Sequence, residues 1–142
     1  MRDFAYENAY LQSCAALEVE AAGKLGRELT NVEVAAIRNP GTLMMQESVG
    51  MTIYYATEPT KLATSLHDAG VGFEERRVEY CKRAVPFLEE QFGRPLNDPE
   101  REAIEGSQYV SDLMQLMVDL GSGDPAQKHA VLAKFTDRTH EG

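Results

Sequence analysis

The chain has 142 residues, about the commonest size for one domain, and 43% of them are hydrophobic, which excludes an intrinsically disordered chain. Its 23 acidic and 14 basic side chains give a net charge of −9, which weighs against direct binding of nucleic acid or anionic lipid. The sequence carries no signal peptide and no run of about 20 apolar residues, so we expect a cytoplasmic protein with reduced thiols.

The first predicted helix runs from about Asp3 to Leu25 and carries an apolar stripe at helical spacing. Gly26 is a suitable left-handed stop for this helix, because glycine adopts that conformation at little cost. Thr30 and Glu33 then have the spacing of a capping box, which predicts the start of a second, short helix. The Asn-Pro-Gly segment 39–41 is expected to end it.

Two further helices complete the first half of the chain. One is predicted from about Thr42 to Ala56 and is apolar nearly all round, which is typical of a central helix or of one covered by a partner. Gly50 within it indicates a close approach to another helix. The next is predicted from about Pro59 to His67, with the segment 68–70 ending it.

The second half follows the same plan. A helix is predicted from about Phe73 to Phe92, with Pro86 in its interior and Gly93 as its stop. The next helix is predicted to run unbroken from about Asp98 to Leu120, and Asp124 is expected to cap a last one. Alternating β-branched residues are missing from the sequence, which therefore predicts an all-α fold.

The two halves resemble each other at a constant offset that takes Gly26 to Gly93, Glu33 to Glu100 and Cys14 to Cys81. We therefore predict a single all-α domain over 1–142, a compact bundle of about six to seven helices. It would consist of two tandem copies of a helix–turn–helix–helix unit, 3–68 and 72–136, with pseudo-two-fold symmetry. The alternative is two unrelated helical segments with similar caps, since cap chemistry recruits the same residue types.

No motif in the sequence predicts a catalytic, cofactor-binding or metal-binding residue. Cys14 and Cys81 lie on apolar stripes, where a free cysteine packs as a small hydrophobic residue. Glu47 is the one candidate for an inward-facing acid, with an exposed helix position as the alternative. Arg27 and Arg94 are interpreted as caps of the carbonyl groups that end the preceding helices, with anion or carboxylate contacts as the alternative.

Three hypotheses about function remain. The first is a non-enzymatic protein-binding protein, a small acidic inhibitor or antagonist of the immunity, antitoxin or anti-defence type that occupies a basic surface of a partner protein. Its proposed contact residues are Glu74, Glu75, Glu79, Glu100, Glu102 and Glu105. The second is a structural or adaptor protein that forms a homodimer or larger assembly through Met51, Tyr54 and Tyr55. The third is an enzyme whose site assembles only in the fold.

Overall fold

The computed structural model describes residues 4–121 and 124–141, with side chains as far as residue 137. These residues form eight helices and no strand, which confirms the all-α prediction and corrects the expected number of six to seven helices. In chain order they are α1 (Ala5–Leu25), α2 (Asn31–Arg38), α3 (Leu43–Tyr54), α4 (Pro59–Gly72), α5 (Glu74–Phe92), α6 (Asp98–Glu105), α7 (Val110–Gly121) and α8 (Pro125–Glu141). The predicted start of the first helix at Asp3 lies outside the described residues.

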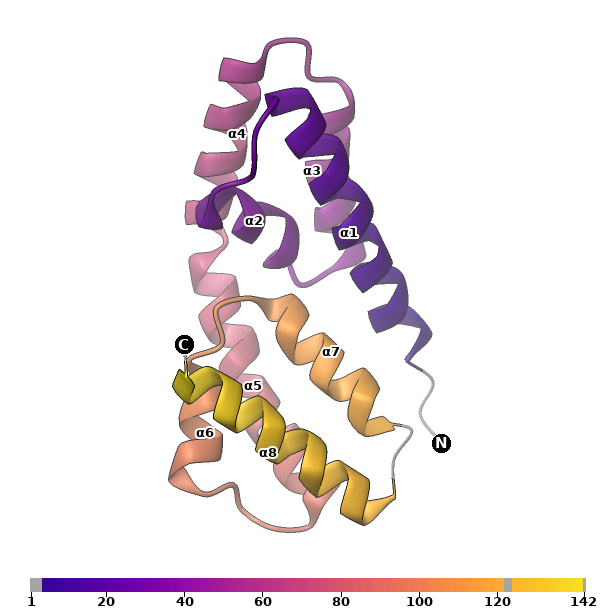
Figure 1. Ribbon diagram of the computed structural model, residues 1–142, viewed down its shortest axis with the longest axis vertical. Coiled ribbons are helices and arrows are strands. Elements are labelled where there is room, and N and C mark those ends of the chain that lie inside the picture. Colours follow the sequence, from indigo (N-terminus) through magenta and orange to yellow (C-terminus); the bar gives the residue numbers. More distant parts are fainter. Residues whose placement is uncertain (1–3, 122–123, 142) are drawn as a thin grey trace.

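The helices form an elongated bundle with the N-terminal half, α1–α4, at one end and the C-terminal half, α5–α8, at the other (Figure 1). Only Phe73 separates α4 from α5, and the two helices run nearly end to end along one side of the molecule. The halves are also joined by α1, which runs along the side of the molecule opposite α4 and packs against α7 (Figure 1).

Two clusters of buried apolar side chains form the core, one for each half. The first surrounds Tyr10, Ile37 and Leu66, and it also includes Val110 and Met114 from α7. The second lies between α5, α6, α7 and α8. Because burying a leucine or isoleucine side chain contributes about 1.5–3 kcal/mol, these clusters supply most of the stability of the fold. The sharing of α7 between them fixes how the two halves meet.

The helix ends follow the local chemistry of the sequence. Gly26 and Gly93 have left-handed φ angles of 70° and 64°, as expected of the residues that stop α1 and α5. Thr30 begins α2 and Asn97 begins α6, each in a complete capping box with the glutamate three residues later. Pro59 occupies the first turn of α4, where its missing N–H costs nothing.

The predicted end of the fourth helix near His67 is wrong, since α4 continues to Gly72. Gly70 does not break the helix but lies against α2. A Cβ atom at Gly70 would be only 2.0 Å from the carbonyl oxygen of Val32. The glycine is therefore needed for the close packing of α2 on α4, which the sequence pattern alone did not reveal.

The predicted unbroken helix to Leu120 is also wrong, because residues 106–109 separate α6 from α7. The side chain of Asn39, from the other half of the molecule, accepts a hydrogen bond from the N–H of Val110 at 2.8 Å. This long-range cap starts a new helix at Val110, whereas Gly106, the C-cap residue of α6, is the local signal for the end of the preceding helix.

α3 is amphipathic in the fold and is not buried all round. Gln46, Val49 and Ile53 face the core, whereas four large apolar side chains on the helix and at its C-terminal end are exposed. These four are Met44, Met51, Tyr54 and Tyr55. The predicted close approach at Gly50 is to α1, since a Cβ atom there would lie 3.2 Å from the side chain of Leu17. None of the described helices has the length and apolar character needed to span a membrane.

Candidate binding site

A cleft of about 520 Å³ lies where the two halves meet. Its apolar wall is formed by Val32 and Ala35 of α2 together with Gly70 and Val71 at the end of α4. Polar side chains of the 106–109 segment and of the start of α5 complete it. Its volume falls within the range of about 300–1,000 Å³ that is usual for ligand sites, so it is the strongest candidate for a preformed binding site among the described residues.

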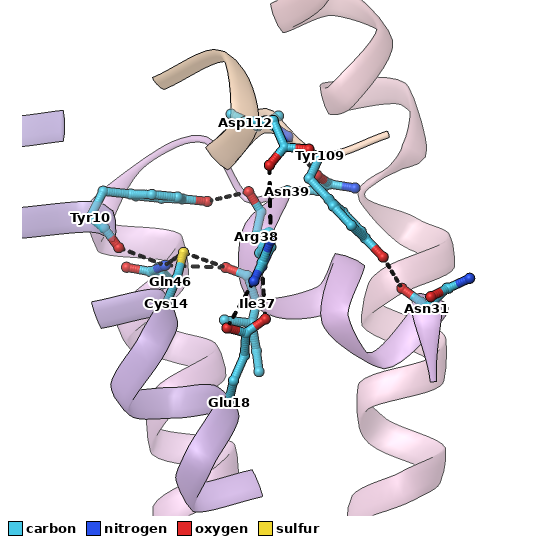
Figure 2. Close-up of polar contacts among 11 residues, drawn as sticks. Tyr10, Cys14, Glu18, Asn31, Ile37, Arg38, Asn39, Gln46, Tyr109 and Asp112 are labelled. Carbon is cyan, nitrogen blue, oxygen red and sulfur yellow. Dashed lines mark hydrogen bonds and ion pairs between the residues drawn. The ribbon is translucent and has the colours of Figure 1, made fainter. Parts of the chain in front are cut away.

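A polar network fixes the segment that forms one side of the cleft (Figure 2). Arg38, the last residue of α2, donates from Nε to Glu18 of α1 at 2.7 Å and lies 3.9 Å from a carboxylate oxygen of Asp112 in α7. The Tyr109 ring centroid is 5.3 Å from the Arg38 guanidinium carbon, and its hydroxyl donates to the carbonyl of Asn31 at 3.5 Å. Arg38 thus ties three helices together and orients the tyrosine ring.

A second group of contacts fixes the turn between α2 and α3. The Tyr10 hydroxyl donates to the carbonyl of Arg38 at 2.9 Å and accepts from the N–H of Gly41 at 3.1 Å. The buried Gln46 amide donates to the carbonyl of Ile37 at 3.1 Å. These bonds satisfy carbonyl groups at the end of α2 that would otherwise be buried without a partner (Figure 2).

Glu74 and Arg77 are the charged residues among those that line the cleft. Arg77 is turned inward, with only 16% of its side chain exposed, and donates to the carbonyl of Ser107 at 2.6 Å and to Glu74. The Glu74 side chain is 57% exposed. The hydrogen bonds from Arg77 lower the pKa of Glu74, so this carboxylate remains ionised at neutral pH.

The other predicted contact residues have different environments. Glu75, Glu79, Glu102 and Glu105 are exposed on α5 and α6, although Glu79 pairs with Arg83 at 3.0 Å. Glu100 is only 9% exposed, and the two guanidinium nitrogens of Arg94 bind its two oxygens at 2.9 and 3.0 Å. Because its carboxylate is used inside the fold, Glu100 is removed from the proposed partner surface.

Arg27 and Arg94 bind carboxylates, which was the alternative interpretation. The prediction that they cap the ends of the preceding helices is wrong. Arg27 donates to both oxygens of Glu33 at 2.7 and 2.9 Å, and Arg94 makes the same fork to Glu100. Each of these glutamates also accepts from the N-cap backbone N–H of its helix. The Arg27 contact lowers the pKa of Glu33 to about 2, and the Arg94 contact lowers the pKa of Glu100.

Acid is expected to destabilise the protein through these two forks. A carboxyl group with a depressed pKa stabilises the fold above its ordinary pKa of 4.5, and this contribution is lost as the pH falls towards about 2. Urea unfolding between pH 6 and pH 2.5 should therefore show a steep loss of stability. In the double variant Arg27→Gln and Arg94→Gln, stability at pH 6 should be lower and the decline shallower. An unchanged slope in that variant would contradict the assignment.

The cysteines lie at the predicted positions in the core. Cys14 and Cys81 are both free and buried. Burial raises the pKa of the Cys14 thiol to about 11, and it also raises the pKa of Cys81. Both thiols therefore stay protonated at neutral pH, which favours the prediction that they serve as packing residues.

Glu47 is exposed on α3 and is not among the residues that line the described clefts. His67 is exposed beside Asp68, and the ring of His129 packs on Phe92 with centroids 5.2 Å apart. In the described part of the chain, no three His, Cys, Asp or Glu side chains are grouped so that they could hold a metal ion. Among the residues whose side chains are described, no hydrogen bond or ion pair joins Glu47 to a histidine.

Most residues of the cleft were not predicted from the sequence. Glu74 was named for its charge, but Asn31, Val71, Gln108 and Tyr109 carry no motif. The sequence did contain a signal for a break in the segment that contains Gln108 and Tyr109. The offset that relates Gly26 to Gly93, applied to the predicted break at 39–41, places a second break at 106–108.

Comparison of the chain with protein-family models, with curated proteins and with solved structures returned no match. The proposals below therefore rest on the geometry and chemistry of the chain itself.

Proposed function

We propose that the protein is a non-enzymatic, cytoplasmic binding protein, a small acidic inhibitor or antagonist that occupies a basic surface of a partner protein. The observation that supports it is the exposure of Glu75, Glu79, Glu102 and Glu105 on two helices that pack against each other, in a chain with a net charge of −9. Carboxylates held on rigid helices attract a basic partner over long range and orient it on contact.

Reversing these four charges is expected to abolish partner binding. The variant Glu75→Lys, Glu79→Lys, Glu102→Lys and Glu105→Lys should fail to capture a partner that the wild-type protein recovers from a lysate of its source organism at low salt. A matched control with the same change in net charge is Glu28→Lys, Glu58→Lys, Asp68→Lys and Asp119→Lys, all exposed elsewhere. Helical circular dichroism should be the same for both. Equal capture by the two variants would exclude this surface.

A second candidate function, self-assembly through α3, is supported by a separate observation. The exposed side chains Met44, Met51, Tyr54 and Tyr55 gather on and just after this helix, whereas soluble proteins rarely leave a contiguous apolar patch uncovered. Light scattering at about 100 μM, where an interface of ordinary affinity is populated, should then give a dimer or larger species. Met51→Glu or Tyr54→Glu should dissociate it. A monomeric wild-type protein would exclude this candidate.

We propose in addition that the chain arose by tandem duplication and that its halves are related by a pseudo-two-fold axis. Shifting α2 and α3 by the offset between Gly26 and Gly93 gives the bounds of α6 and α7, and both halves contain the same arginine–glutamate fork. A strict two-fold axis would give the contact of α1 with α7 an equal counterpart between α5 and α3, and that counterpart is much smaller. The proposed symmetry is therefore approximate and concerns the fold of each half. An experimental structure in which α1–α4 fails to superpose on α5–α8 would contradict it.

A further inference from the structure

The cleft between the halves combines apolar walls with a single exposed charge. Val32, Ala35 and Val71 line it, and Val71 is among the most exposed large apolar side chains of the protein. Glu74 also lines it, with 57% of its side chain exposed; both of its carboxylate oxygens accept from Arg77, which is held inward by the carbonyl of Ser107. A ligand therefore meets a hydrophobic surface next to a half-exposed carboxylate that is already paired with Arg77 on one side.

The remaining lining groups add aromatic and amide surfaces. The Tyr109 ring lines the cleft, and its orientation is fixed by Arg38 behind it and by the hydroxyl bond to Asn31. The side chains of Asn31 and Gln108 are exposed at the cleft. Each amide offers both donors and an acceptor, which is what a peptide backbone needs from its receptor.

We propose that this cleft binds a peptide segment of the basic partner through an arginine side chain, an inference that rests on the proposed function. The aliphatic stem of arginine would pack on Val32, Ala35 and Val71, while its planar guanidinium would bind the Glu74 carboxylate. The carboxylate has lone pairs left beside those that Arg77 occupies. The volume of about 520 Å³ exceeds one side chain and leaves room for the flanking backbone, which Asn31 and Gln108 would bind.

Charge and shape favour this occupant over others. An acidic ligand would be repelled by the net charge of −9. A purely apolar ligand would remove water from the Glu74 carboxylate without replacing its hydrogen bonds, which carries a free-energy cost. Arginine satisfies the carboxylate and the apolar wall together.

The test is a titration of the ¹⁵N-labelled full chain with the acetylated and amidated tripeptide Ala-Arg-Ala, followed by NMR. A Kd near 1 mM is expected for so short a probe, with shifts concentrated at the backbone amides that line the cleft. The analogue with citrulline, which is neutral and of nearly the same shape as arginine, should bind about tenfold more weakly or not at all. Equal shifts from both peptides, or none from either at about 10 mM, would overturn the proposal.

Variants distinguish binding in the cleft from general electrostatic attraction to an acidic protein. Glu74→Gln should weaken binding of the arginine peptide about tenfold. The matched control is Glu90→Gln, at an exposed position on the same helix outside the cleft, and it should leave the affinity unchanged. Val71→Trp fills the cleft from an exposed position and should block binding of the peptide. It is an independent test, because it leaves the pair of Glu74 and Arg77 intact. Equal weakening by Glu74→Gln and Glu90→Gln would show nonspecific attraction and overturn the proposal.

The same variants distinguish failure of this inference from failure of the proposed function. Capture of a basic partner that is unaffected by Glu74→Gln and Val71→Trp would retain the function and reject the cleft as its site. Binding of the arginine peptide in the cleft, with only non-basic proteins or none recovered from the lysate, would retain the cleft and reject the acidic antagonist.

Discussion

Replacing Gly70 with alanine is expected to lower the free energy of unfolding by about 2 kcal/mol. The added Cβ atom would lie 2.0 Å from the carbonyl oxygen of Val32 and 2.8 Å from its Cγ1 atom, both far inside van der Waals contact. Since the first of these is a backbone atom, rotation of a side chain cannot relieve the clash. α2 must move away from α4, which disturbs the wall of the cleft and the contacts of Arg38 at the end of α2.

The control for this prediction is Gly72→Ala, two residues along the same helix. A Cβ atom at Gly72 meets nothing within 4 Å, so the substitution should be neutral or should stabilise the protein by up to about 0.5–1 kcal/mol, because alanine favours the helix. Thermal and urea unfolding measure both variants, and 1 kcal/mol corresponds to roughly 2–4 °C in Tm for a chain somewhat larger than this one. If Gly70→Ala proved as stable as Gly72→Ala, the close packing of α2 on α4 described above would be wrong.

Local chemistry explains which parts of the fold could be predicted from the sequence. Gly26 and Gly93 end helices because of backbone geometry, and Thr30 with Glu33 begins one through contacts three residues apart. Such interactions are complete within a few residues of the chain. Gly70 resembles a terminator by the same local criterion, yet it lies inside a helix because its small size is required by α2.

Long-range contacts explain what could not be predicted. The start of α7 depends on Asn39, which lies in the other half of the chain, and the arginine forks depend on where Glu33 and Glu100 project after their helices form. The cleft likewise requires α2, the end of α4, the start of α5 and the 106–109 segment to converge. Of the residues that line the cleft, only Glu74 was proposed as a contact residue from the sequence, and the reason was its charge.

Burial determines which carboxylates of this protein are available to contact a partner. In the sequence, Glu74, Glu100 and Glu102 are equivalent members of an acidic set. In the fold, Glu100 holds a helix start together with Arg94, Glu74 stands at an apolar cleft, and Glu102 is exposed on α6. Net charge therefore describes how the protein attracts a partner, whereas the position of each carboxylate determines whether it can contact one.

Replacing Asn39 with alanine is expected to lower the free energy of unfolding by about 2 kcal/mol, because it leaves the N–H of Val110 buried without its acceptor. Asn39 is 1% exposed, and its Oδ1 atom accepts from that N–H at 2.8 Å, while its Nδ2 atom lies 3.5 Å from the carbonyl of Gln108. Val110 is fully buried between the two halves, so water cannot replace the side chain without opening the core. Asn31→Ala, at the exposed first residue of α2, the helix that Asn39 follows, is the matched control and should change stability by less than about 0.5 kcal/mol.

Amide hydrogen exchange locates the effect of Asn39→Ala. Protection of the backbone amides should fall at Val110 and along the first turn of α7. At α8 it should fall by no more than the loss of overall stability of the variant requires. Asn39→Asp keeps the acceptor but loses the donor and places a charge near Asp112, so it should restore only part of the protection at Val110. Equal unfolding free energies for Asn39→Ala and Asn31→Ala would mean that the bond across the halves does not hold α7. If Asn39 does hold it, one buried amide sets where α7 begins, positions Tyr109 beside it, and thereby shapes the cleft in which we place the partner's arginine.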